Sequence, residues 1–278
     1  MSSIGRGVLL SLAGFLWGGA PAGAQDRIFP RLPSFELPAA SPRVHGIVGR
    51  VISAQQGESR FGREAEAEVA LGENVPVIAL RRGVRPITLG IGTAVYARFS
   101  LDDPRSAMIS NDWVVGLNTT AVLDAWALTL ELYHESSHLG DEYGDRFDVT
   151  RLDWTREVAA GWASYTSGLF RFTGGVSYVL LDELRLARPG SSFAGDFKGR
   201  PLGRVLGGQL KPLAGLYVEA NAATHWRMST SAKLGFALGS SEGREVGIAL
   251  IAHDGLSTQR QFFRQESRYV GMELKLDL

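Results

Sequence analysis

A histidine and a serine, His134 and Ser136, stand two positions apart in a stretch whose apolar residues recur at every second place. On a β-strand such residues share one face and lie ~6.6 Å apart, a gap that an imidazole can bridge to a hydroxyl. A base that takes the Ser136 proton would make this serine a nucleophile, and Asp148 on the following strand would orient the His134 ring. These residue types therefore predict ester hydrolysis by a serine nucleophile.

The strand that positions this pair is predicted by strict alternation of apolar and polar side chains. One face consists of Trp126, Leu128, Leu130 and Leu132 and ends in the pair; the other consists of Thr129, Glu131, Tyr133 and Glu135. A strand with an apolar outer face and a polar inner face is typical of a membrane β-barrel. We expect the pair to look outward into acyl chains, at the outer rim of the apolar band.

The same segment supports two other interpretations. If the chain curls after the strand, His138, Asp141 and Glu142 could meet around a metal ion, and calcium is the ion that carboxylate oxygens favour. His134 and His138 cannot share an ion on a strand, because they would lie ~13 Å apart. Histidine, serine and aspartate at a barrel rim also bind headgroups and loop backbone without any catalytic role, since short motifs arise often by chance.

Alternating segments continue along the chain and separate into about twelve strands, an even number, as is usual for such barrels. Long connections alternate with short ones from Ser100 onward, which matches outer loops and periplasmic turns; the one exception is His225–Met228, which is short where a long loop is expected. The chain has 29 Lys+Arg, 29 Asp+Glu and no cysteine, so its neutral charge gives no reason to expect nucleic acid as a partner. The prediction is an all-β protein with one antiparallel transmembrane β-barrel over residues 43–278.

Both ends of the sequence carry features of exported bacterial proteins. Residues 1–24 combine Arg6, an apolar run and a small-x-small cleavage site, and are predicted to be a signal peptide. Residues 25–42 are rich in proline and are predicted to be an irregular lead-in. The last strand alternates up to Leu278 and resembles the assembly signal of outer-membrane proteins. Outer-membrane lipids and the barrel-assembly machinery are the expected partners, and the oligomeric state stays open.

Charged residues on the polar faces are expected to close the barrel interior through ion pairs rather than to line an open pore. By alternation, the inward acids are Glu64, Glu66, Glu68, Glu131, Glu135, Glu157 and Glu219. Their candidate partners are Arg98, Lys233 and Arg81 or Arg82. Five aromatic residues are predicted to anchor the barrel at the membrane interface, with packing in the core as the alternative: Trp126, Trp154, Trp162, Trp226 and Tyr178.

The segment YHESSHLGDE at Tyr133–Glu142, with the preceding Asn111-Asp112-Trp113, resembles the bacterial domain-of-unknown-function family 1207. This resemblance implies an outer-membrane barrel without an assigned activity. It covers residues 111–162 most specifically, and it supports location more than chemistry.

A second resemblance is local. His134-Glu135-Ser136 is similar to the His-x-Ser element of outer-membrane phospholipase A and of the lipid A deacylases. In those enzymes the histidine and the serine lie on the lipid-facing side of one strand, and a polar or acidic partner follows on the next strand. Asp148 has a spacing similar to that of this partner, whereas Ser137 and His138 depart from the pattern after the serine.

Two functions remain open. The first is an integral barrel of the bacterial outer membrane with an envelope-structural or small-solute role. The alternative is an outer-membrane lipid esterase with Ser136 as nucleophile, His134 as base and Asp148 as orienting acid. Calcium is the one cofactor that the sequence suggests.

Overall fold

The computed structural model describes residues 27–30, 35–56, 65–82, 85–103, 105–239 and 244–277. The predicted signal peptide, residues 1–24, lies outside these residues, as does Leu278. The predicted inward charges of Glu64, Arg81 and Arg82 also fall on side chains outside the described part.

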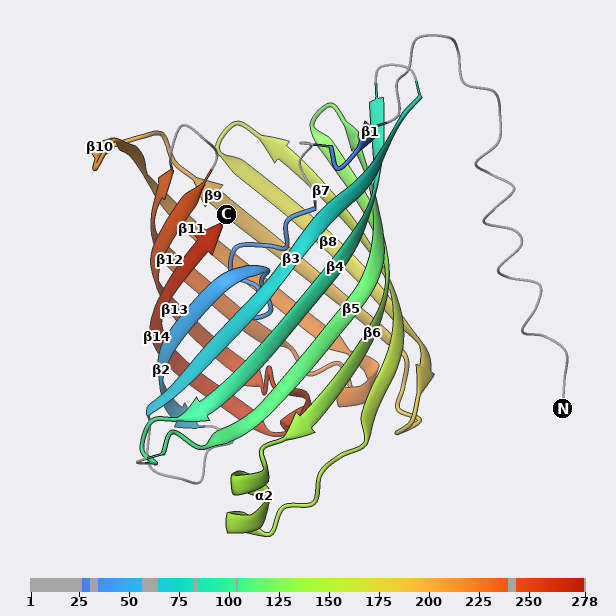
Figure 1. The fold of residues 1–278 in the computed structure, drawn as a ribbon, viewed down its shortest axis with the longest axis vertical. Coiled ribbons are helices and arrows are strands. Elements are labelled where there is room, and N and C mark those ends of the chain that lie inside the picture. Colours follow the sequence, from blue (N-terminus) through green and yellow to red (C-terminus); the bar gives the residue numbers. More distant parts are fainter. Residues whose placement is uncertain are drawn as a thin grey trace, which may run out of the picture.

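Twelve antiparallel strands in this part of the chain form a closed ring (Figure 1). In order around the ring they are β2 (Gly46–Gln56), β3 (Ala65–Arg82), β4 (Arg85–Ser100), β5 (Met108–Leu123), β6 (Trp126–Leu139), β7 (Trp154–Ser167), β8 (Phe170–Asp182), β9 (Pro189–Lys198), β11 (Gly208–Asn221), β12 (Ser229–Gly239), β13 (Glu245–Leu256) and β14 (Glu266–Asp277). Pairing of β14 with β2 closes the barrel. Outside the ring, β1 (Arg27–Ile28) pairs with β3, and β10 (Gly203–Val205) pairs with β11. The predicted all-β barrel of about twelve strands is confirmed.

The outer surface of the ring is a belt of exposed apolar side chains. Leu117 and Leu130, for example, are 62% and 65% exposed. Trp126, Trp226 and Tyr178, three of the predicted interface anchors, are exposed as well. Lipid tails cover such a belt in a membrane barrel. Within the described residues, each helix is too short or too polar to cross a bilayer.

Ion pairs fill much of the lumen. Arg50 bonds to both Glu68 and Glu273. Arg98 Nη2 donates to Glu68 Oε2 at 2.8 Å, and Lys233 Nζ lies 2.6 Å from Glu273 Oε1. Buried charges of this kind persist only when opposite charges and hydrogen bonds compensate their desolvation. The predicted ion-paired interior is therefore confirmed for Glu68, Arg98 and Lys233.

Two predictions about β7 are wrong. Trp154 and Trp162 point into the lumen, where each indole N–H donates to a glutamate, so they do not anchor the barrel in the interface. Glu157 points outward, on the same side of the sheet as His134. The reason is that the lumen beside β7 is partly apolar, since Phe263 packs on Trp154 with ring centroids 5.0 Å apart. The prediction placed the more apolar face of β7 against the membrane, whereas in the structure this face lines the lumen.

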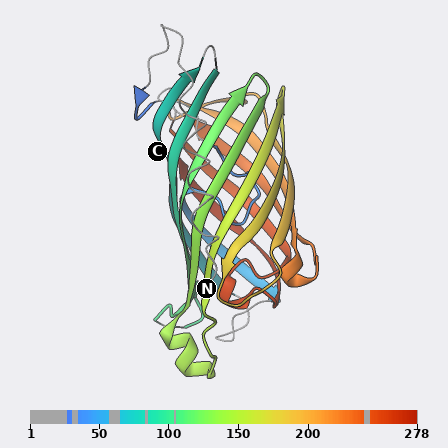
Figure 2. The ribbon, with the colours of Figure 1, turned by 90° about the vertical axis from the view of Figure 1, so that its right-hand side faces the viewer.

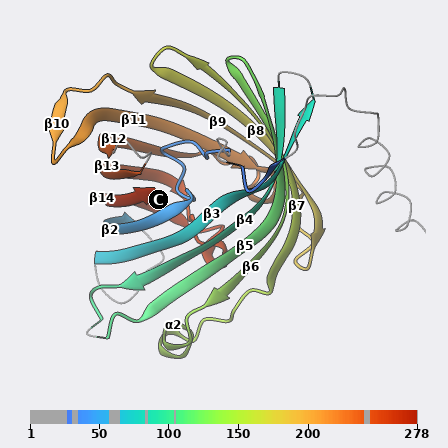
Figure 3. The same ribbon diagram turned by 45° about the horizontal axis from the view of Figure 1, so that its top comes forward.

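Residues 35–45, which precede the first barrel strand, run through the lumen (Figure 3). We call them the lumen segment. Arg171 Nη2 donates to Leu37 O at 3.2 Å, and Ala39 N donates to Asp196 Oδ1 at 3.0 Å. Residues 35–45 contain no helix or strand, which agrees with the predicted irregular lead-in over the part they share. Their backbone hydrogen-bonding groups are met by wall side chains instead of by a sheet.

The two ends of the barrel differ. Connections that contain α2 (Asp141–Phe147), η2 (Ala222–Thr224) and η3 (Arg260–Phe262) lie at one end (Figure 2). At the other end, β5 and β6, and likewise β7 and β8, are joined by tight turns. Long loops mark the outer side of such barrels, so the α2 end is the outer end.

Candidate functional site

His134 and Ser136 lie on β6, close to the outer end of the strand. They continue the outward face of Leu132, which is 50% exposed, and both are partly exposed themselves. Ser136 stands opposite Trp113 of β5 and Thr155 of β7. The strand register thus agrees with the predicted outward orientation of His134 and Ser136. Ser136 lies between the indole ring of Trp113 and the hydroxyl of Thr155.

A carboxylate holds the imidazole from the neighbouring strand. His134 stands directly opposite Glu157, and His134 Nδ1 lies 2.9 Å from Glu157 Oε1. The two side chains are 38% and 40% exposed. A carboxylate that accepts a hydrogen bond from Nδ1 leaves Nε2 to accept a proton, which is the tautomer that a general base needs.

Asp148 does not lie opposite His134. It follows α2, where it adopts a left-handed conformation with φ 49°, and its backbone N–H donates to Gly144 O. The connection between β6 and β7 contains this helix and residues 148–153, which belong to neither helix nor strand, so Asp148 lies before the following strand and not on it. Pairing of β7 with β6 begins at Trp154, which stands opposite Ser137. Glu157 therefore stands opposite His134, in the position expected for Asp148.

The predicted metal ligands are not gathered into one site. His138 lies on β6 opposite Asn111, whereas Asp141 and Glu142 are exposed in the first turn of α2. Carboxylates in a first turn stabilise the positive end of the helix dipole. Among the described residues there is no group of three histidine, aspartate or glutamate side chains that could hold an ion.

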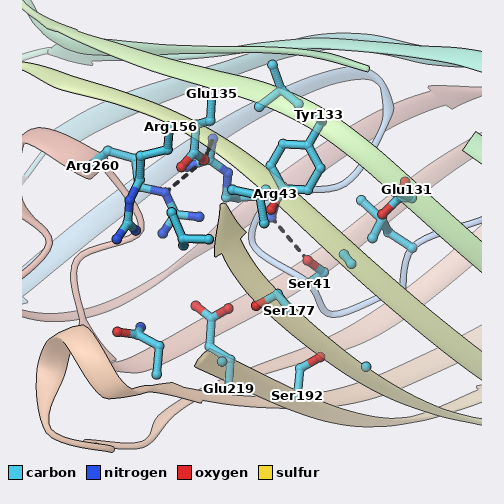
Figure 4. A pocket seen from close by; sticks show the side chains of 18 of the residues that line it. Ser41, Arg43, Glu131, Tyr133, Glu135, Arg156, Ser177, Ser192, Glu219 and Arg260 are labelled. Atoms are coloured by element: carbon cyan, nitrogen blue, oxygen red, sulfur yellow. Dashed lines mark hydrogen bonds and ion pairs between the residues drawn. The ribbon is translucent and has the colours of Figure 1, made fainter. Parts of the chain in front are cut away.

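The lumenal side of the same strand segment is held by charge. Glu135, between the histidine and the serine, is 3% exposed. It accepts hydrogen bonds from Arg260 Nε at 2.9 Å and Trp154 Nε1 at 3.0 Å, and it pairs with Arg43 at 3.0 Å. Arg43 pairs in turn with Asp112 at 2.8 Å. Arg43 of the lumen segment and Arg260 of the β13–β14 loop thus both contact Glu135, the inward residue between His134 and Ser136 (Figure 4).

The β13–β14 loop also joins β6 to the end of the β6–β7 connection. Gln261 Nε2 donates to Ser137 O and to Leu152 O, both at 3.0 Å. Leu152 N donates to Gln261 Oε1 at 2.8 Å. Gln261 is 6% exposed, so these bonds are shielded from water. The backbone beside Ser136 is therefore fixed from inside the barrel.

Arg260 of this loop stays charged. Burial alone would lower the pKa of Arg260, but Glu135, Glu219 and Asp112 raise it above the ordinary value. Removing one of these carboxylates would leave part of a buried positive charge uncompensated.

A cavity of about 210 Å³ lies in the lumen beside this charge cluster (Figure 4). Its polar lining includes Arg156 and Arg260 as well as Ser177, Ser192 and Glu219. The cavity is lined on its inside by part of the lumen segment, including Ser41. The lumen is therefore not completely filled.

The sequence matches the family model described as "Protein of unknown function (DUF1207)" over residues 35–278. The chain belongs to this family. The family resemblance predicted from Tyr133–Glu142 is confirmed. No curated protein sequence matches the DUF1207 chain.

Solved structures similar to the DUF1207 barrel are outer-membrane proteins. Outer membrane phospholipase A from Escherichia coli is 13% identical, with a TM-score of 0.55 over 86% of this chain and 94% of that chain. The outer membrane phospholipase of Salmonella typhi, a dimer with bound calcium, is 12% identical, with a TM-score of 0.56 over 88% of this chain and 94% of that chain. LpxR from Salmonella typhimurium is 12% identical, with a TM-score of 0.41 over 84% of this chain and 100% of that chain.

At these identities the two phospholipases show the fold. The DUF1207 barrel has the fold of bacterial outer-membrane proteins, and its exposed apolar belt places it in the outer membrane, as predicted.

Sequence reasoning named Glu157 but placed it on the wrong face. The sequence did separate the two faces of β7: Thr155 and Glu157 lie on one face, and Trp154 and Arg156 lie on the other. The face with Thr155 and Glu157 is the outward one. Polar residues on an outward face near the rim mark the end of the apolar belt, which is where His134 and Ser136 also lie.

Proposed function

We propose that this DUF1207 barrel hydrolyses acyl esters of membrane lipids, with Ser136 as nucleophile, His134 as general base and Glu157 as the group that orients His134. The observation that carries the proposal is the hydrogen bond between His134 and Glu157 on the lipid-facing surface, two positions from an outward serine. It supports a catalytic role because a base with an orienting carboxylate is what activates a serine.

The reaction would proceed in two steps. Ser136 Oγ attacks the ester carbonyl and gives its proton to His134 Nε2, while Glu157 stabilises the imidazolium. The tetrahedral intermediate collapses, the alcohol of the lysolipid leaves with the proton from His134, and the fatty acyl group stays on Ser136. Water then attacks the acyl-serine with His134 as base, so that the fatty acid leaves and Ser136 regains its proton.

The position of the serine favours a lipid over a soluble ester. Ser136 lies at the end of an exposed apolar strand face and opposite Trp113, which is 52% exposed. An acyl chain in the bilayer would reach it along this face without leaving the membrane. Outer-membrane lipids are the partners that this proposal requires, and the barrel-assembly machinery is the partner expected for insertion.

Calcium enters the proposal only as a variable to test. The similar phospholipase of Salmonella typhi was solved as a dimer with bound calcium. The described residues of one DUF1207 chain gather no ligand set of three, so the reaction above contains no step through a metal ion.

The second candidate is a barrel that holds or passes a small solute, without any ester chemistry. The cavity of about 210 Å³ in the lumen favours it. The lumen segment occupies part of the barrel interior, so binding of a small solute fits the structure better than free diffusion through a pore.

The test compares Ser136→Ala with wild type in detergent micelles, using a fluorogenic acyl ester with and without calcium. Thr119→Ala, on the outward face of β5, is the matched control. Loss of hydrolysis in Ser136→Ala alone, with the heat-modifiable fold unchanged, is the expected result. Equal activity in all three proteins, or no activity in wild type under either condition, would refute the lipid esterase and leave the solute role.

A further inference from the structure

The lumenal cavity has opposite charges on two of its sides. Arg156 and Arg260 lie on one side, toward β6, and Glu219 lies on the β11 side with Ser177 and Ser192 of β8 and β9 nearby (Figure 4). Many other lumenal charges are held in close ion pairs, and Glu131, which also lines the cavity, accepts a hydrogen bond from Trp162 Nε1.

The positive side has donors to spare. Arg260 bonds to Glu135 through Nε only, and its side chain is 24% exposed although it lies in the lumen. Arg156 pairs with Asp182 through Nη2, while its Nε is buried and has no hydrogen-bond partner. Arg156 is 8% exposed, so bulk water does not satisfy this donor. Because this nitrogen has almost no accessible surface, the donors left for a solute are the Nη groups of Arg260.

The negative side has acceptors to spare. Glu219 Oε2 accepts a hydrogen bond from Tyr217 at 3.1 Å, which fixes the orientation of the carboxylate. In the described part of the chain, no lysine, arginine or histidine side chain lies within ion-pair distance of Glu219. Its charge still reaches Arg260 across the cavity, where it raises the pKa of that guanidinium. The two groups face each other but are kept apart.

We infer that the lumen binds a small zwitterionic solute of the amino-acid type, with its carboxylate toward Arg260 and Arg156 and its ammonium group toward Glu219. A guanidinium recognises a carboxylate through parallel N–H donors, and a carboxylate flanked by hydroxyls recognises an ammonium group. A cavity of about 210 Å³ has room for a solute of this size. This site is separate from the proposed esterase and does not depend on it.

The electrostatics favour a zwitterion over a neutral polyol. A polyol could bond to the serines but would leave the facing charges of Arg260 and Glu219 uncompensated. A simple anion would meet Glu219 with like charge, and a simple cation would meet Arg260. A solute with both charges satisfies both ends at once, and the cavity then sets the distance between them.

The test is calorimetric titration of the full barrel in detergent micelles with glycine, β-alanine and γ-aminobutyrate, which together vary the spacing of the charges. We expect saturable binding with a Kd on the order of 1 mM or tighter for at least one of them. The N-acetyl derivative and the methyl ester of that compound, each of which removes one charge, should bind at least about tenfold more weakly.

Variants separate this site from a general effect of charge. Glu219→Gln should weaken the amino acid at least about tenfold while leaving the weak binding of its N-acetyl derivative unchanged. Glu245→Gln, which removes a partly exposed carboxylate paired with Lys198, is the matched control and should bind like wild type. Absence of saturable binding, equal affinity for the two singly charged derivatives, or equal affinity in Glu219→Gln would each overturn the inference.

Discussion

His134 Nδ1 lies 2.9 Å from Glu157 Oε1, and the two residues stand directly opposite each other on the outward faces of β6 and β7. An exposed ion pair or hydrogen bond of this kind adds little to stability, since exposed pairs contribute about 0–1 kcal/mol. Its effect on a reaction can be larger, because the carboxylate fixes the tautomer and the direction of a base beside Ser136.

Glu157→Gln is expected to lower acyl-ester hydrolysis by about 10²–10⁴-fold, because the amide stabilises the imidazolium less well. Asp148→Asn, beyond the end of α2, should leave the rate unchanged. Single-turnover labelling of Ser136 by a fluorophosphonate measures the step directly. Equal loss in both variants would point to a disturbed hairpin instead of an orienting carboxylate.

Glu135→Gln is expected to destabilise the barrel, since it leaves the buried charges of Arg43 and Arg260 partly uncompensated. Breaking a buried ion pair costs about 3–5 kcal/mol. Urea unfolding in micelles should therefore show a clearly lower midpoint. Arg227→Gln, in an exposed pair with Glu266, provides the comparison and should change the free energy of unfolding by no more than about 1 kcal/mol. Similar midpoints for the two variants would contradict the role given to the lumenal cluster.

Gln261→Ala should loosen the hairpin that carries the candidate site. It removes the three hydrogen bonds with Ser137 and Leu152, each worth about 0.5–1.5 kcal/mol. Backbone amide exchange around Ser137 and Leu152 should become faster, and proteolysis within the β6–β7 connection should increase. Gln265→Ala, at an exposed position of the same loop, should leave both measurements as they are in wild type.

Deletion of residues 35–42 is expected to open the lumen. This removes the partners of Arg171 and Asp196 together with the chain that crosses the barrel. Single-channel recordings in planar bilayers should show a larger conductance than wild type, whose lumen is narrowed by this segment. An unchanged conductance in a correctly folded deletion variant would mean that the wall side chains and the β13–β14 loop close the barrel by themselves.

The sequence by itself determined the strand period, the closed all-β barrel of about twelve strands, and the outward face of β6 from Leu130 to Ser136. Those features follow from local alternation, because a strand places every second residue on one side whatever its neighbours are. The tertiary structure decided which residue stands opposite His134, because the register depends on the length of the connection that contains α2.

The tertiary structure also decided which face of β7 meets lipid. Alternation separates two faces but does not say which of them is lumenal, and here Phe263 and residues 35–45 fill a lumen that is partly apolar. Trp154 is buried inside the barrel and Glu157 is left outside for that reason. The facing charges of Arg260 and Glu219 arise in the same way, because a loop distant in sequence folds back into the barrel that the alternating strands form.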